Sequence, residues 1–403
     1  MGRLKILDLD SPNLCPVVDG NLVLTYNGEL YNYLELREEL IKLGHEFHTE
    51  SDSEVLLKAY KEWSTDCLSK FNGMFAFAIY NGTSFFLARD IAGEKPLYYR
   101  KTDFAFASEA KALGKCIEFP PAHYATWTGT HLQFHRYWFP PTKEREVDLS
   151  TAVGELDALL QSAVSLRTRA HVPYALYKSG GIDSSLIATY HVFEHQYTYE
   201  DRSEYKDEFL KTFPKILWHL DYPIKSFSAF GLWKLAEEAS KEVKVVLSGE
   251  GADELFGGYV RYVPNEFNRL ARREFPSYQA LFPYKDMLRE EFHGNMRELL
   301  RMGDRMAGAW GIENRCPFLD KRVIEFAMSL PMRHKIDGLN TKVILRELLK
   351  RRNPSYRFEE KRGLYCSVNS WLGSSEKYGK DAYTKYQKEL CKVKSWSQEV
   401  SDF

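Results

Sequence analysis

The sequence predicts two domains: an α+β domain over residues 1–145 and an α/β domain with a parallel sheet and a helical C-terminal region over residues 146–403. Three observations support this prediction. Strand-like alternation dominates the first third of the chain, a proline-rich junction follows at 135–148, and the second part shows strand, glycine-rich loop and helix twice in succession. A chain of 403 residues is long enough to bury two hydrophobic cores.

The composition excludes several classes of protein. Lys and Arg total 55 against 56 Asp and Glu, which leaves no excess positive charge for a nucleic-acid backbone or an anionic membrane. No apolar run reaches the length of about 18 residues that a membrane span requires. The first ten residues lack the apolar core of a signal peptide, and the six cysteines lack metal-site spacing. We therefore expect a cytoplasmic protein that acts on small molecules, with no nucleic-acid or membrane partner. The composition is compatible with a homodimer.

The α+β domain is predicted from alternating segments. Strands are expected at 21–26, 74–80, 84–90 and 104–109, and residues 33–62 carry apolar side chains at helical spacing. Turn residues such as NG and AGEKP separate these segments. Together they indicate a sheet-rich domain with helices inserted between its strands.

The α/β domain opens with a helical pattern after residue 148. Strand-like residues 172–177 run into SGGIDSS and a helix, and strand-like residues 243–247 run into SGEGADELFGGY. Beyond about residue 265 the pattern is mostly helical. Strand, loop and helix in this order, twice, predict a parallel sheet flanked by helices. If the two strands are neighbours, both loops open at the same edge of the sheet, where ligands bind in such folds.

The first loop has the features of a phosphate site. It comprises Ser179, Gly180, Gly181, Ile182, Asp183, Ser184 and Ser185. Its glycines let the backbone approach a ligand closely, and free N–H groups at a helix start favour an anion. It is not a Walker A loop, because GxxxxGK[ST] does not occur in the chain. The alternative is an ordinary strand-to-helix turn in which Asp183 or Ser184 caps the helix.

The second loop carries three carboxylates, Glu250, Asp253 and Glu254, among its glycines. An unpaired, solvated loop is one interpretation, but a hard cation such as Mg²⁺ offers these carboxylates a better partner. If the two loops meet, Asp183 and Asp253 would share magnesium with a polyphosphate.

These segments resemble the glutamine-hydrolysing asparagine synthetases. SGGIDSS and VVLSGEGADELFGGY are similar to the two nucleotide-binding motifs of that family, and ILWHLD, ENRCPFLD, KVILR and KRG match further segments. In the first domain RLKILDLDS, TYNGELYNY, TESDSEV, FNGMFAFAIY and ARDIAGEKPLYY match as well. The resemblance implies an αββα sandwich of the N-terminal-nucleophile hydrolases, a type 2 glutamine amidotransferase domain. An adenine-nucleotide-hydrolase-like synthetase domain of the pyrophosphatase-loop group would follow it.

The resemblance implies a ligase of amino-acid biosynthesis that makes asparagine from aspartate with ATP and Mg²⁺, through a β-aspartyl adenylate. Ammonia, free or from glutamine, would then displace AMP. Asp183 and Asp253 would hold the metal and pyrophosphate, Glu250 would lie beside the adenylated carboxylate, and Lys361 would stabilise phosphate charge. The remaining ATP and pyrophosphate contacts would be Tyr177, Ser179, Gly180, Gly181, Ser184, Ser185, Ser248 and Gly249.

The same resemblance implies a glutamine site in the first domain. Asn27 and Gly28 match the family's oxyanion hole, and Arg3, Glu29 and Asp52 match the groups that bind the two ends of glutamine. If the resemblance to the family is left aside, NGE is interpreted as a hairpin turn and ESDSE as a capped helix start.

The sequence departs from the family in two places. Met1 and Gly2 stand at the start, without the N-terminal cysteine nucleophile, and Cys15 is internal, so we predict a structural role for it. Ammonium, and not glutamine, is therefore expected to support activity. No apolar strand-length run lies between Tyr190 and Leu210, so the strand beside the adenine is expected to be missing.

Two alternative functions remain. A related carboxylate-adenylating enzyme, such as a β-lactam synthetase, would lack the cysteine, but the intact NGE and SDSE segments argue against it. A degenerate, non-catalytic relative would explain a missing strand, but the intact SGGIDSS and SGEGADE loops argue against that.

Overall fold

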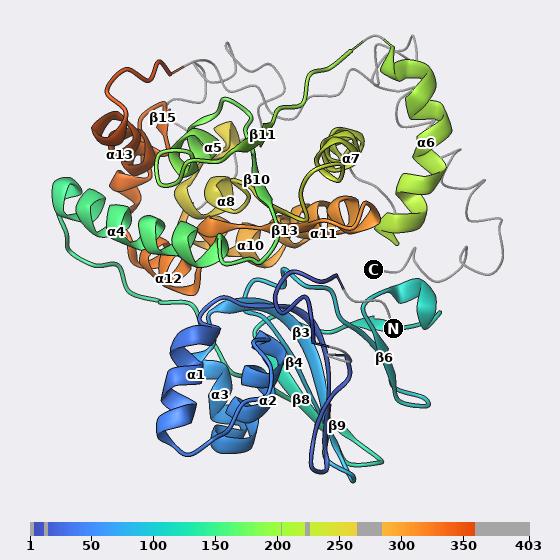
Figure 1. Cartoon of the computed structure of the whole chain (residues 1–403). Helices are drawn as coiled ribbons and strands as arrows, with labels where there is room; N and C mark the ends of the chain where they lie inside the picture. The colour runs from blue at the N-terminus through green and yellow to red at the C-terminus, as the bar shows by residue number, and fades with distance from the viewer. Residues whose placement is uncertain (1–3, 12–14, 203, 222–225, 264–283, 359–403) are drawn as a thin grey trace.

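The computed structural model describes residues 4–11, 15–202, 204–221, 226–263 and 284–358 (Figure 1). Two of the sequence-predicted site residues, Arg3 and Lys361, lie outside these ranges. Among the residues that the structure describes, no helix has both the length and the apolar character needed to cross a membrane.

The N-terminal part is built on a six-stranded antiparallel sheet in the order β1-β2-β3-β4-β8-β9, and a second sheet has the order β6-β5-β7. The strands are β1 (Val17–Asp19), β2 (Leu22–Leu30), β3 (Gly73–Tyr80), β4 (Phe85–Arg89), β5 (Tyr98–Arg100), β6 (Ala105–Ala107), β7 (Ile117–Glu118), β8 (His123–Trp127) and β9 (Leu132–Arg136). The helices are α1 (Tyr33–Lys42), α2 (Asp52–Trp63) and α3 (Cys67–Lys70), with the short 3-10 segments η1 (Ser64–Asp66) and η2 (Ala110–Ala112).

Strand β3 shows how these layers are held together. Phe75, Phe77 and Ile79 pack on one face of the sheet with the apolar side chains of the helices. Ala76 and Ala78 point to the other face, where the second sheet packs. Because successive side chains of a strand point to opposite faces, the buried strand joins a helical layer to the second sheet. Helices α1, α2 and α3 lie on one side of the large sheet (Figure 1), so the described residues form three of the four predicted layers.

The C-terminal part contains a parallel sheet in the order β11-β10-β12-β13. Its strands are β10 (Tyr174–Tyr177), β11 (His195–Tyr197), β12 (Val245–Leu247) and β13 (Glu313–Arg315), and a separate hairpin joins β14 (Ile336–Asp337) to β15 (Asn340–Thr341). The helices are α4 (Leu149–Arg167), α5 (Ile182–Ile187), α6 (Tyr205–Leu220), α7 (Ser228–Ala239), α8 (Ala252–Phe256), α10 (Tyr284–His293), α11 (Asn295–Ala309), α12 (Lys321–Ser329) and α13 (Val343–Arg352). Short 3-10 segments are η3 (Val260–Tyr262), η5 (Pro317–Leu319) and η6 (Met332–His334).

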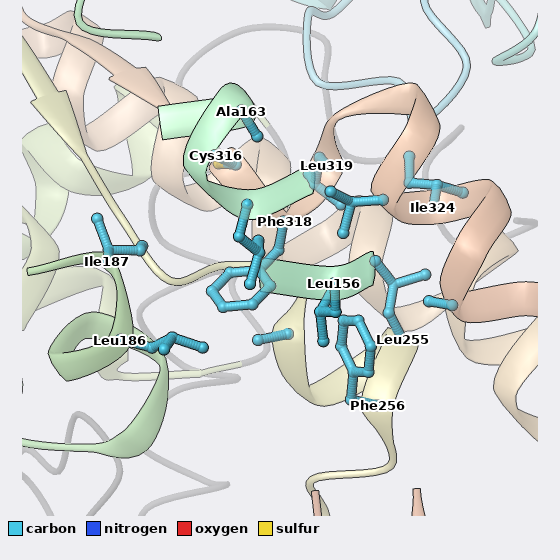
Figure 2. Packing of buried hydrophobic residues seen from close by; sticks show 14 of the residues in the cluster. Leu156, Ala163, Leu186, Ile187, Leu255, Phe256, Cys316, Phe318, Leu319 and Ile324 are labelled. Atoms are coloured by element: carbon cyan, nitrogen blue, oxygen red, sulfur yellow. The ribbon is translucent and has the colours of Figure 1, made fainter. Parts of the chain in front are cut away.

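The largest core of the molecule lies between these helices and the parallel sheet. Leu156 and Ala163 lie on the same face of α4 and pack in the same buried cluster as Phe256 and Phe318 (Figure 2). An antiparallel, helix-covered N-terminal part and a parallel α/β C-terminal part confirm the predicted fold class.

One expectation about this sheet is wrong. A strand is present between Tyr190 and Leu210, since β11 pairs in parallel with β10 from Ala175 opposite His195 to Tyr177 opposite Tyr197. Its sequence, His-Gln-Tyr, is polar because the strand lies at the edge of the sheet, so a search for an apolar run could not find it. The helix predicted after SGGIDSS is also shorter than expected and ends at Ile187.

Buried polar groups join the two parts of the chain. The Arg167 guanidinium lies 3.0 Å from the Asp320 carboxylate, and both side chains are almost fully buried. The Asn72 amide, which precedes β3, donates to the same carboxylate at 2.9 Å. Asp320 therefore ties a loop of the N-terminal part to the helices of the C-terminal part.

Gly28 provides a test of the pairing between β2 and β3. It lies opposite Phe75 with a φ of 149°, and a Cβ there would overlap the Met74 carbonyl oxygen. We expect Gly28→Ala to lower the free energy of unfolding by about 3 kcal/mol or more, because backbone atoms cannot move aside. Urea unfolding followed by circular dichroism measures this loss.

The matched control is Gly20→Ala. Gly20 has a φ of 61° but open space around its Cα, so only the conformational cost of about 1 kcal/mol is expected. Equal losses for the two variants would contradict the steric explanation.

Candidate functional site

The two glycine-rich loops meet at one edge of the parallel sheet. Strands β10 and β12 are direct neighbours, with Leu176 opposite Leu247, so both loops leave the sheet at its carboxyl edge. The loops also touch: a Cβ on Gly249 would lie 2.7 Å from the Cβ of Asp183. Glycine is therefore required at position 249 for the loops to come this close.

Lys342 joins the two sequence-predicted metal ligands. Its Nζ lies 2.6 Å from both carboxylate oxygens of Asp183 and 2.7 Å from Oδ1 of Asp253. Burial alone would lower the pKa of this ammonium group, but the two carboxylates outweigh burial and raise the pKa above its usual value. A Cβ on Gly258 would overlap both Asp253 and Lys342, so this glycine leaves room for the ion pair.

This arrangement fits a magnesium ion that a polyphosphate also coordinates. Two carboxylates converge on one cationic nitrogen, so both can reach a common cation. Within the described ranges, no group of three or more His, Cys, Asp and Glu side chains could hold a metal by itself. Ligands from a bound phosphate would therefore complete the coordination of a metal held by Asp183 and Asp253.

Hydroxyl groups from inside and outside the SGGIDSS loop hold it in place. The Ser184 hydroxyl accepts a hydrogen bond from the Ser179 backbone N–H at 3.1 Å, and the Tyr356 hydroxyl donates to the Gly180 carbonyl at 2.7 Å. The N-cap of α5 is Gly181, with no side-chain cap. The alternative in which Asp183 or Ser184 caps the helix is therefore wrong.

Glu250 lies in the second loop, where two side-chain donors reach one of its carboxylate oxygens. Its Oε2 accepts from the Asn314 amide at 3.1 Å and from the Cys316 thiol at 3.7 Å. A Cβ on Gly303 of α11 would lie 2.7 Å from Oε1, so the backbone of this helix forms one wall around the carboxylate. Burial, and next the charge of Glu254, raise the pKa of Glu250 to about 8.

Two further predicted nucleotide residues lie beside Glu250. The Tyr177 hydroxyl is buried, and no hydrogen-bond partner for it exists in the described part of the chain. Burial, and then the charge of Glu250, raise the pKa of Tyr177. The Ser248 hydroxyl lies 3.6 Å from the Cys316 sulfur. The structure therefore gathers Tyr177, Ser248 and Glu250 at the same edge as Asp183 and Asp253.

A second site is a cavity of about 600 Å³ between the two parts of the chain. Four of the five predicted glutamine residues line it, namely Asn27, Gly28, Glu29 and Asp52. Cys15, for which a structural role was predicted, also lines this cavity, as do residues of α11 and β13. The fifth predicted residue, Arg3, lies outside the described residues.

The local structure explains how these residues are placed. Asn27, Gly28 and Glu29 lie inside β2, so the alternative that NGE is a hairpin turn is wrong. The capped helix start is correct, because Ser51 is the N-cap of α2 and accepts from the Ser53 N–H at 3.2 Å. That cap places Asp52 in the first turn of α2, at the cavity wall.

The cavity holds a pair of buried carboxyl groups. Burial raises the pKa of both Glu29 and Asp52, and the charge of Asp52 raises that of Glu29 further. Oδ2 of Asp52 accepts from the Leu30 N–H and the Tyr26 hydroxyl, each at 2.9 Å. Oε1 of Glu29 is buried, and no described residue hydrogen-bonds to it. A cationic amine would stabilise such a pair.

Strand β13 connects the two sites. Arg315 is fully buried, lies 3.2 Å from Glu29 and 2.8 Å from Glu313, and donates to the carbonyl oxygens of Arg167 and Arg169. The neighbouring Asn314 faces Glu250 on the other side. One three-residue strand therefore contacts a carboxylate in each site.

Four residues of these sites had no role assigned from the sequence. Asn314, Arg315, Cys316 and Lys342 lie in segments that match the family, but their partners are far away in the chain. Two acidic loops at one sheet edge do require a nearby cation. That signal predicts a lysine or arginine without indicating which one.

The fold and the two sites define a two-part ligase, in which an amidotransferase-type domain accompanies a synthetase domain. Residues 1–137 match the family model described as "Glutamine amidotransferase domain". Residues 155–203, 193–297 and 283–391 match that described as "Asparagine synthase". The chain belongs to the asparagine synthase family, which confirms the resemblance found in the sequence.

Curated relatives agree with this assignment. The chain is 33% identical to a probable asparagine synthetase [glutamine-hydrolyzing] of Schizosaccharomyces pombe, over 86% of this chain and 71% of that protein. It is 28% identical to asparagine synthetase [glutamine-hydrolyzing] 1 of Bacillus subtilis, over 92% and 80%. A glutamine phosphoribosylpyrophosphate amidotransferase from B. subtilis has a TM-score of 0.30 at 15% identity, over 72% of this chain and 75% of that one. No conclusion is drawn from so low a score.

The Lys342 ion pairs can be tested by stability. We expect Lys342→Ala to lower the free energy of unfolding by about 3 kcal/mol, because Asp183 and Asp253 would both lose the buried ammonium group that they contact. Lys350→Ala is the control. Lys350 is exposed on α13, the helix that begins after Lys342, and its ion pair with Glu347 is long, at 4.0 Å. Thermal and urea unfolding compare them, and similar losses for both variants would show that Lys342 has no special role.

Proposed function

We propose that the chain catalyses ATP-dependent synthesis of asparagine from aspartate, with nitrogen from ammonia or glutamine. A side-chain carboxylate oxygen of aspartate attacks the α-phosphorus of ATP, and pyrophosphate leaves. Ammonia then attacks the acyl carbon of the β-aspartyl adenylate and displaces AMP. The observation that carries this proposal is the meeting of Asp183, Asp253 and Lys342 beside Glu250, at the carboxyl edge of the parallel sheet.

The cationic group and the loops have distinct tasks in this proposal. Lys342 moves its ammonium group from the aspartates toward the phosphate oxygens as negative charge develops on pyrophosphate. Asp183 and Asp253 would hold magnesium, which would supply further positive charge at the polyphosphate. Ser248 and Gly249 contact the nucleotide, and the Ser179 to Ser185 loop contacts pyrophosphate. Lys361 keeps its predicted role in stabilising phosphate charge.

Glu250 suits the proton transfer that amide formation requires. Ammonia that has attacked a carbonyl carbon must lose a proton, and a carboxyl group with a pKa of about 8 is a matched acceptor near neutral pH. Asn314 and Cys316 hold one oxygen of Glu250. In this proposal the other oxygen, Oε1 beside Gly303, accepts the proton.

The N-terminal cavity is proposed to bind glutamine. Glu29 and Asp52 bind its α-ammonium group, Arg3 its carboxylate, and Asn27 with Gly28 stabilises the oxyanion formed at its amide. The wall contributed by α11 and β13 brings this cavity up to the strand that also contacts Glu250.

Three further statements belong to this proposal. The boundary between the two domains lies near residue 145, and the protein forms a homodimer in the cytoplasm. Cys67, Cys116 and Cys316 form no disulfide in the described part, which is compatible with a reducing compartment. The retained residues Asn27, Gly28, Glu29 and Asp52 along one cavity favour asparagine synthesis over a β-lactam synthetase, and the Lys342 cluster argues against a degenerate relative.

Exchange of labelled pyrophosphate into ATP tests the synthetase reaction. We expect exchange that requires both aspartate and Mg²⁺, and a loss of at least about 100-fold in Asp253→Asn, because electrostatic stabilisation of leaving pyrophosphate contributes this much. Asp207→Asn, an exposed position on α6, should retain full exchange. Exchange with a different carboxylate only would support the β-lactam-type alternative, and absence of ATP binding would support the degenerate one.

Calorimetric titration with glutamine tests the cavity. Asp52→Asn should weaken glutamine binding by at least about tenfold, since a buried ionic contact to the amino group is lost. Glu38→Gln on the exposed face of α1 is the control and should bind as the wild type does. Unchanged affinity in Asp52→Asn, with an unchanged melting temperature, would rule out this binding mode. Product analysis with ammonium and with glutamine then identifies the nitrogen donor.

A further inference from the structure

Cys316 is a buried cysteine whose polar contacts are unusual for its surroundings. It is 2% exposed and lies in the largest apolar cluster, near Ala163 of α4 and Phe318 (Figure 2). Its sulfur nevertheless lies 3.6 Å from the Ser248 hydroxyl and 3.7 Å from Oε2 of Glu250. Both partners belong to the proposed synthetase site.

The direction of these hydrogen bonds follows from the chemistry of the thiol. Burial, and next the charge of Glu250, raise the pKa of Cys316 well above its usual value, so the thiol keeps its proton. It can therefore donate to the Glu250 carboxylate and accept from the Ser248 hydroxyl. This order gives a chain of donors from Ser248 through Cys316 to Glu250.

The same carboxylate oxygen receives a second donor from the same strand. Asn314 and Cys316 are two residues apart, so they lie on one face of the extended segment, and the Asn314 amide reaches Oε2 at 3.1 Å. Gly303 closes the opposite side. A glutamate side chain is flexible, and two donors on one oxygen with a backbone wall behind it restrict its rotamers.

We propose that Cys316 is a positioning residue that links Ser248, at the nucleotide, to Glu250 and holds the Glu250 carboxylate toward bound aspartate. The inference rests on the proposed function and extends it to a residue outside the reacting groups. Valine at this position would fill a similar volume but donate no hydrogen bond. Serine would keep a donor.

The groups around Glu250 determine whether loss of the Cys316 hydrogen bond raises or lowers the pKa of Glu250. They are Tyr177 from β10, Glu254 from α8, Asp304 from α11, Glu94 from the turn before β5, and Asn314 and Cys316 from β13 and the residue after it. Glu254 and Asp304 raise the pKa of Glu250, whereas the two hydrogen bonds lower it. Loss of one donor must therefore favour the protonated form and raise the titration midpoint.

The primary test does not depend on activity. The carboxyl ¹³C resonance of Glu250 in the full chain, identified by its loss in Glu250→Gln, is followed by NMR as a function of pH. We expect Cys316→Val to raise the midpoint by about half to one pH unit, which is the contribution of one hydrogen bond to a carboxylate. Cys316→Ser should remain close to the wild type. Cys116→Val, in the N-terminal part, is the control and should leave the midpoint unchanged.

Kinetics provide the second readout. Because Glu250 acts after the adenylate has formed, the assay is ammonium-dependent asparagine formation, in which we expect Cys316→Val to lower kcat about three- to tenfold at pH 7 and less at pH 9, with the KM for ATP nearly unchanged. Cys316→Ser should restore most of the loss. A purely packing role predicts equal losses at both pH values and no rescue by serine.

The outcomes separate this inference from the proposed function. Equal Glu250 midpoints in Cys316→Val and the wild type, or equal shifts in the valine and serine variants, would overturn the positioning role. A wild-type protein without aspartate-dependent exchange would instead overturn the proposed function, while the titration would still decide whether Cys316 holds Glu250.

Discussion

The guanidinium group of Arg315 is fully buried where the two parts of the chain meet. Its nitrogens contact the carboxylates of Glu29 and Glu313 and two carbonyl oxygens at the end of α4, and the ring of Tyr31 lies 5.4 Å away. Removing one partner of a buried ion pair typically costs about 3–5 kcal/mol. The strand that carries Arg315 is therefore fixed to both parts at once, and the geometry of both candidate sites depends on it.

The position of this strand in turn determines where the second glycine-rich loop of the synthetase site begins. The Ser248 backbone N–H donates to the Arg315 carbonyl at 3.0 Å, so the second glycine-rich loop begins at a defined position beside β13. Close contact between Gly249 and Asp183 then sets the spacing of the two loops. Gly249 and Gly258 have no side chains, so Asp183, Asp253 and Lys342 can come closer together than larger residues at these two positions would permit.

The sequence predicts those features that local patterns determine. Alternating apolar residues give β2, β3 and β4, and apolar runs before glycine-rich loops give β10 and β12. The apolar pattern does not predict the polar strand β11, because a strand at a sheet edge can pair without apolar residues. NGE looks like a turn locally, yet pairing of Gly28 with Phe75 makes it strand. Lys342 lies 159 residues from Asp183, and only the tertiary fold reveals such a partner.

The alternation of side chains along β13 limits which insertions and deletions this strand can tolerate. A slip of one residue would turn Arg315 toward Glu250 and Asn314 toward Glu29, because neighbouring side chains of a strand exchange faces. Both candidate sites therefore depend on one register. A single insertion or deletion in this strand would therefore displace side chains in both candidate sites at once. Recombination between related chains would have to keep the length of β13 unchanged.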